Sequence, residues 1–135
     1  MMNKRKLMAL AVGRACAEDL PTYTDPFANE STYRRLVDGW AQSLSTAYAD
    51  VVFIGDSLTY AGHWEEYFPS VIVDNLGVVG DITYGLVMRL PLLEALKPAK
   101  CFVMVGVNDL MYHSTVEDTV EMYDRLLTGL EDICE

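Results

Sequence analysis

Short apolar runs alternate with segments of helical periodicity through most of the chain. Strands are predicted at 51–55, 71–75 and 101–105, and the first is apolar at consecutive positions, as a parallel strand buried on both faces is. Between and around them the spacing predicts helices at 31–47, in a short segment containing Trp64, at 82–97 and from 116 to 134. Such alternation predicts an α/β fold: a parallel sheet with right-handed crossovers and helices on both faces.

Two of the predicted helices carry specific expectations. Pro91 removes a backbone donor, so it should kink the helix at 82–97 or begin a second helical segment there. In the last helix an acidic face opposes one apolar stripe, which we expect to be buried. The stripe consists of Val116, Val120, Tyr123, Leu127, Leu130 and Cys134.

The chain divides into a leader, 1–30, and a domain, 31–135. Residues 1–17 imitate a secretory signal, with basic residues, an apolar stretch and small residues at 15–17. That stretch is only about six residues long and Arg14 interrupts its end, whereas signals have seven or more apolar residues. A cytoplasmic location is therefore favoured over a secreted or periplasmic one. Residues 18–30 hold two prolines without periodicity and are expected to form a loop.

Charge and cysteine content narrow the function classes. A net charge of −10 excludes nucleic acid as an expected partner, because phosphate binding needs clustered Lys and Arg. No stretch approaches the length of a membrane-spanning helix. Cys16, Cys101 and Cys134 are too few and too far apart to predict a disulfide framework or a zinc site, and Cys101 is expected to be a small buried hydrophobe.

Polar and glycine residues follow each predicted strand. Ser57 follows the first strand, a glycine-bearing turn at 75–81 follows the second, and Asn108 follows the third. The carboxyl ends of parallel strands open on one edge of a sheet, where ligands bind. A hydroxyl, a free backbone N–H and a carboxamide at one edge are the groups that acyl transfer requires: a nucleophile and an oxyanion hole.

Each loop also has an interpretation without catalysis. Ser57 can be a turn former, Gly80 can serve only its turn, and Asn108 with Asp109 can simply cap the next helix. That all three loops have only such structural roles is the less economical explanation.

These motifs resemble those of the SGNH hydrolases, also called GDSL lipases and esterases, over about residues 50 to 133. Gly55-Asp56-Ser57-Leu58 resembles the family's first block, residues 75–83 its second, and Gly106-Val107-Asn108-Asp109 its third. The resemblance implies a three-layer, flavodoxin-like fold with strand order 2-1-3, of which about three of five strands are present. It also implies Ser57 as nucleophile, oxyanion donors at the Ser57 and Gly80 N–H groups and the Asn108 side chain, and a structural role for Asp56.

The family's Asp-x-x-His motif does not occur in this sequence. Its two histidines, His63 and His113, follow Tyr60 and Leu110 at that spacing. We therefore expect the N-terminal part of a serine esterase domain, weak or inactive without its base. The alternative is a non-catalytic, truncated or degenerate relative that binds a ligand or serves in assembly.

Expected substrates are small esters or acylated carbohydrates, with no metal and no cofactor. The third strand, 101–105, should be an open apolar edge of the sheet, through which a second copy of the chain can pair.

Overall fold

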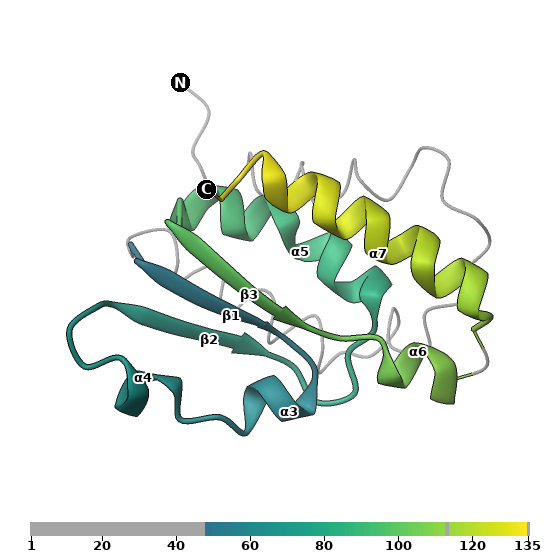
Figure 1. Cartoon of the computed structure of the whole chain (residues 1–135), viewed down its shortest axis with the longest axis horizontal. Coiled ribbons are helices and arrows are strands. Elements are labelled where there is room, and N and C mark those ends of the chain that lie inside the picture. The colour runs from purple at the N-terminus through teal and green to yellow at the C-terminus, as the bar shows by residue number, and fades with distance from the viewer. Residues whose placement is uncertain (1–47, 113, 135) are drawn as a thin grey trace.

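The computed structural model describes residues 48–112 and 114–134, and within them three strands form one parallel sheet (Figure 1). These strands are β1 (Val51–Gly55), β2 (Val73–Gly77) and β3 (Lys100–Met104), in the order β2-β1-β3. Phe53 of the central strand lies opposite Asn75 on one side and Phe102 on the other. The predicted strand order is therefore confirmed, with β3 at an edge of the described sheet.

Helices cover both faces of this sheet, as predicted. They are α3 (Ser57–Tyr60), α4 (Trp64–Tyr67), α5 (Thr83–Leu96), α6 (Val107–Met111) and α7 (Val116–Glu131). Figure 1 shows α5 and α7 together on one face and the short helices α3 and α4 on the other. The chain thus has the three layers of an α/β fold, consistent with a partial flavodoxin-like sheet.

The main core lies between the sheet and the pair α5 and α7. Val52 and Ile54 of β1 are fully buried there, with Leu86 and Leu93 of α5 and Leu126 of α7. Burying an aliphatic side chain of this size contributes about 1.5–3 kcal/mol relative to leaving it exposed. This cluster therefore holds the two long helices on the sheet.

Stacked aromatic rings pack on the opposite face of the sheet. Phe53 stacks on Trp64 with ring centroids 4.3 Å apart and on Phe102 at 4.9 Å. The Trp64 indole N–H donates to the Thr59 carbonyl at 2.8 Å. Because Trp64 is satisfied in this way, its role here is to fasten the segment after α3 to the sheet.

Element boundaries differ from the sequence prediction in three places. The second strand begins at Val73 rather than at residue 71, because the Ile72 N–H donates to the Asp50 carboxylate at 2.7 Å and is not available to a strand partner. One helix, α5, runs through Pro91 without dividing, with buried leucines on both sides of it. The region after Ser57 forms two short helices, and α6 occupies part of the predicted loop after residue 106.

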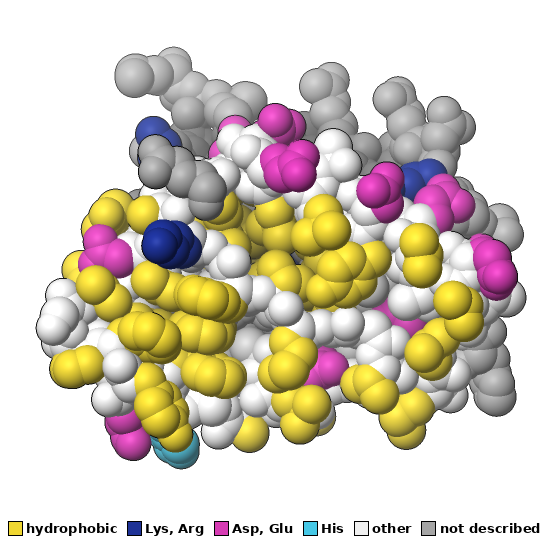
Figure 2. Space-filling model, viewed as in Figure 1, with side chains coloured by type: hydrophobic (Ala, Val, Ile, Leu, Met, Phe, Trp, Pro, Cys, Tyr) yellow, Lys and Arg dark blue, Asp and Glu magenta, His cyan; other side chains and the backbone are white. Residues whose placement is uncertain are grey.

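The prediction for the buried face of α7 is largely wrong. The buried side chains are Met122, Leu126 and Leu130, an i, i+4, i+8 row, and only Leu130 belonged to the predicted stripe. Val116 and Val120 are each 61% exposed. α7 packs mainly on α5, and that contact selects the Met122 row. Figure 2 accordingly shows hydrophobic side chains on the surface near α7 and over the strands, with acidic side chains along the outer side of α7.

The cysteine prediction is also wrong. Cys101 and Cys134 form a disulfide with a Cα–Cα distance of 6.4 Å. Although 33 positions separate them, α7 runs back along the sheet and brings its C-terminal end to the start of β3. Sequence distance therefore concealed their proximity.

Some predictions fall on positions that the structure does not describe. The leader at 1–30, the helix at 31–47, the third cysteine Cys16 and His113 lie outside the described residues. Among the helices of the described part, none is long and apolar enough to cross a membrane.

Candidate active site

Ser57 is the first residue of α3, directly after the central strand. Asp56 precedes it as the helix N-cap: its buried carboxylate accepts the Leu58 N–H at 2.9 Å. This confirms a structural role for Asp56. The N–H of a first helical residue has no acceptor within its own helix, so the cap leaves the Ser57 N–H unused while the Ser57 side chain remains partly exposed.

The loop after β2 approaches the end of β1 and the backbone of α3 closely because glycine permits it. Val78 donates to the Gly55 carbonyl at 2.9 Å, which joins this loop to the end of β1. A Cβ on Gly77 would overlap the backbone of Tyr60 in α3. Gly80 follows with a φ of 79°, in the left-handed region that glycine adopts without strain.

Asn75 fastens α3 to β2, a role that the sequence analysis missed. Its side-chain oxygen accepts the Gly77 N–H at 2.9 Å, and its amide nitrogen donates to the carbonyls of Thr59 and Gly62, both at 3.0 Å. Polar residues at 74 and 75, directly after three apolar ones, were the available signal. The side chain thus orders the backbone that leads away from Ser57.

The loop after β3 is joined to both other loops. The Asp56 N–H donates to the Met104 carbonyl at 3.3 Å, beside Ser57. Asn108, in α6, donates from its side-chain nitrogen to the backbone carbonyl of Asp81 at 2.8 Å, one residue beyond Gly80. Three loops at the carboxyl ends of three strands are therefore connected by hydrogen bonds.

Asn108 and Asp109 do not cap the next helix, which was the alternative explanation for them. Asp109 is fully buried and accepts from the backbone N–H of Thr83 at 3.1 Å and from its hydroxyl, at the start of α5. The cap of α7 is Thr115, which accepts the Asp118 N–H at 3.0 Å. Both residues of the third loop thus contact the second loop and the helix after it.

A buried ion pair lies at the second loop, and the sequence analysis did not predict it. Arg89 of α5 and Asp81 are each 2% exposed and are joined through a guanidinium nitrogen and a carboxylate oxygen. The second terminal nitrogen of Arg89 donates to the Leu76 carbonyl at 2.6 Å. An arginine inside a helix with buried apolar residues was the available signal.

Within the described residues, no hydrogen bond joins His63 to Ser57. His63 is the N-cap residue before α4, with a side chain 74% exposed, and its ring lies 4.0 Å from the Glu65 carboxylate. Within residues 48–112 and 114–134, no group of three metal-ligating side chains could hold an ion.

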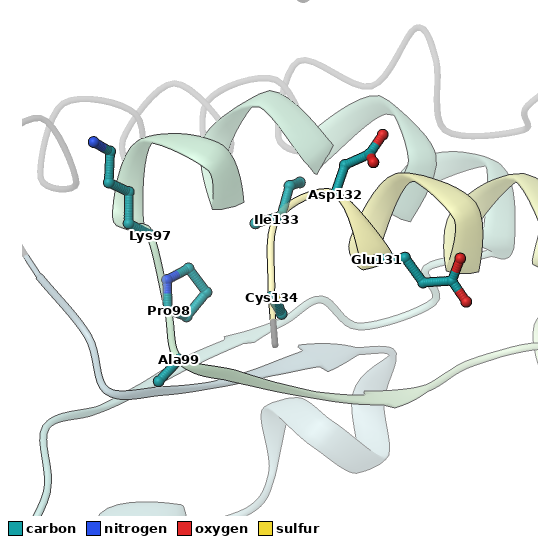
Figure 3. A pocket seen from close by; sticks show the side chains of 7 residues that line it. All are labelled: Lys97, Pro98, Ala99, Glu131, Asp132, Ile133 and Cys134. Atoms are coloured by element: carbon teal, nitrogen blue, oxygen red, sulfur yellow. The ribbon is translucent and has the colours of Figure 1, made fainter.

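An open cavity of about 480 Å³ lies at the opposite end of the strands from the three loops (Figure 3). The segment Lys97–Ala99 before β3 lines it on one side, and residues 131–134, at and just after the end of α7, line it on the other. Parallel sheets bind ligands at the carboxyl ends of their strands, and this cavity is at the amino end of β3. This cavity is therefore separate from the site that the three loops form.

Comparison with known proteins identifies the family. Residues 53–134 match the model of the GDSL-like lipase/acylhydrolase family, and no curated protein matches the chain. A solved structure from Streptococcus pneumonia, described as a "putative platelet activating factor", is similar in fold, with a TM-score of 0.62 and 20% identity. That similarity covers 74% of this chain and 49% of the solved one, so the chain spans about half the length of its structural relative. The family match extends over more than half of the sequence and includes all three loops: the chain belongs to the GDSL-like lipase/acylhydrolase family.

Proposed function

We propose that this chain carries the nucleophile and the oxyanion hole of a serine esterase that acts on carboxylic esters. The observation that carries the proposal is the hydrogen bond from Asn108 to Asp81, which holds a carboxamide beside the Gly80 loop. The loop with Gly80 is in turn joined to the end of β1, two residues before Ser57. A hydroxyl and three donors on one rigid edge suit acyl transfer.

Each proposed donor has a local reason to be free for a substrate oxygen. The Ser57 N–H is at the start of a helix whose cap is used by Leu58. One N–H of the Asn108 amide donates to Asp81, and the second remains for a developing negative charge. Gly80 has a φ of 79°, a conformation that glycine adopts without strain, and we expect this turn to present its N–H to a substrate.

In this mechanism the Ser57 oxygen attacks the ester carbonyl carbon and loses its proton. The carbonyl oxygen becomes an oxyanion, which the three donors stabilise. The tetrahedral intermediate collapses, the alcohol leaves with a proton, and an acyl-serine remains. Water then attacks the acyl-serine and releases the carboxylic acid, which restores the Ser57 hydroxyl.

Exposed aliphatic residues adjoin each of the proposed site residues. Leu58 follows Ser57, Val79 precedes Gly80 and Val107 precedes Asn108, with exposed fractions of 62%, 63% and 53%. Apolar side chains at such an edge favour the acyl part of a small ester. An acylated carbohydrate is the other substrate class to assay, with its sugar extending into solvent.

The proton of Ser57 needs an acceptor, and the exposed ring of His63 lies 4.0 Å from the Glu65 carboxylate, with no hydrogen bond to Ser57 among the described residues. A serine hydroxyl is a weak nucleophile without a base. Loss of a triad member still leaves about 10³–10⁴-fold catalysis over water in the serine protease template. We therefore expect this chain to react slowly with activated esters.

Labelling with a fluorophosphonate probe tests the proposal. We expect slow covalent modification at Ser57, located by peptide mass spectrometry, that is absent in Ser57→Ala and retained in Ser70→Ala, a serine in an exposed turn. Wild-type labelling no greater than that of Ser57→Ala would contradict the esterase proposal and favour a non-catalytic binding or assembly module. Rapid hydrolysis of p-nitrophenyl acetate that requires Ser57 would instead contradict the expected weakness.

A further inference from the structure

A buried guanidinium bridges the two ends of the loop that contains Gly80. Arg89 donates to the Leu76 carbonyl in β2 at 2.6 Å and to the carboxylate of Asp81, two residues before α5 begins. Charge-assisted hydrogen bonds are roughly twice as strong as neutral ones, and burial strengthens them further. One side chain therefore holds both ends of this loop.

Asp81 transmits this restraint to two further groups. Its second carboxylate oxygen accepts the Ile82 N–H at 3.0 Å, and its backbone carbonyl accepts the side-chain amide of Asn108 at 2.8 Å. The Asp81 N–H also donates to the Val78 carbonyl at 3.2 Å, which closes the turn that contains the Val79–Gly80 peptide. The orientations of the Gly80 N–H and of the Asn108 side-chain amide thus depend on where Asp81 is held.

We propose that Arg89 is a positioning residue that sets the oxyanion hole through Asp81. The proposal rests on the function proposed above, since Gly80 and Asn108 are the donors that it positions. Arginine suits this task because its planar fork spans two acceptors, whereas the ammonium of lysine is a single point charge on a flexible stem. Donors stabilise a transition state only when they are held in place before the reaction.

A role in stability alone makes a different prediction. Buried ion pairs are often no more stabilising than well-packed apolar residues. If the ion pair served stability alone, weakening it would increase amide hydrogen exchange throughout the fold. A positioning pair would release the Asp81 segment selectively.

Amide hydrogen exchange by NMR distinguishes the two roles without requiring any catalysis. In Arg89→Lys we expect hydrogen exchange to accelerate roughly 10- to 100-fold at two groups, the Ile82 backbone N–H and the Asn108 side-chain amide. This factor corresponds to loss of one hydrogen bond to a charged group. The Thr83 N–H, whose acceptor is Asp109, is the internal control and should change little. Arg125→Lys is the matched control, because Arg125 forms an exposed pair with Glu121 at 2.7 Å.

The rate of Ser57 labelling by the fluorophosphonate is the second measurement. We expect Arg89→Lys to slow it at least about tenfold, as loss of oxyanion stabilisation does, and Arg125→Lys to leave it unchanged. Should Arg89→Lys fail to fold, the double variant Asp81→Asn/Arg89→Met takes its place, because it leaves no lone buried charge.

The outcomes separate this proposal from the one on which it rests. Exchange that rises equally at Ile82, Asn108 and Thr83, or at none of them, overturns the positioning role. Selective exchange with an unchanged labelling rate overturns it as well. Absence of Ser57 labelling in the wild type defeats the esterase proposal, and the exchange pattern then decides by itself whether Arg89 holds the loop.

Discussion

Removal of the Cys101–Cys134 disulfide should destabilise the chain substantially. The bond joins the start of β3 to the segment after α7 and closes a loop of 33 residues. In the chain-entropy model this crosslink is worth about 3.7 kcal/mol at 25 °C, between the values for loops of 15 and 100 residues. That is a large fraction of the 5–15 kcal/mol by which typical domains are stable.

Urea unfolding monitored by circular dichroism measures this contribution. A Cys16→Ser background leaves one cysteine pair, and the oxidised protein is compared with its reduced form and with Cys134→Ser. With a slope near 2 kcal/mol per molar urea, the oxidised midpoint should lie roughly 1.5–2 M above both thiol forms. Thiol titration of the denatured protein reports the state of the pair directly.

Coincident midpoints for the three forms would refute this reasoning, as would two free thiols in the protein prepared without reductant. A lower midpoint for Cys134→Ser alone, with the reduced wild type unaffected, would show that packing of the Cys134 side chain matters and the crosslink does not.

Four further predictions follow from the structure. Asn108→Ala should lower the rate of Ser57 labelling by about 10²–10³-fold, as loss of one oxyanion donor does, and an unchanged rate would exclude this side chain from the site. Leu126→Ala should destabilise by about 2–5 kcal/mol in urea unfolding, because Leu126 is fully buried, and the 45% exposed neighbour in Leu127→Ala should cost far less. Burial raises the pKa of Asp74, so ionisation of this carboxyl destabilises the folded state. Asp74→Asn should therefore increase the free energy of unfolding at pH 7, and this gain should disappear as the pH falls below the ordinary carboxyl pKa of 3.8. We also propose that the open edge of β3 pairs with a second copy of the chain; light scattering should then show a dimer that Phe102→Lys dissociates, and a monomer at high concentration would contradict the pairing.

Much of the architecture could be predicted because its signals are local. Three consecutive apolar runs, each followed by small or polar residues, indicate buried parallel strands and the loops at their carboxyl ends. The structure adds that Gly55 and Gly77 lie so close to neighbouring backbone that a Cβ at either position would overlap it. The assignment of Ser57, Gly80 and Asn108 to catalysis stays a prediction until labelling tests it.

Other features depend on which helices and strands pack against each other. Helical periodicity identified α7 but predicted a stripe of which only Leu130 is buried. Packing on α5 buries Met122, Leu126 and Leu130. Pro91 predicted a kink or the start of a second helical segment, and the structure shows one continuous helix α5 through it.

The sequence by itself determined the α/β class and the three chemistry-bearing loops, because each depends on neighbouring residues and on the general topology of parallel sheets. The strand order followed from the family resemblance. Only the tertiary structure decided the disulfide, the Arg89–Asp81 pair and the bond from Asn108 to Asp81. Their partners are 33, 8 and 27 positions apart in the sequence. The disulfide and the Asn108–Asp81 bond form because the chain returns distant segments to neighbouring positions after it crosses from one strand to the next. The pair within eight positions depends instead on the turn that folds the loop back on its own helix.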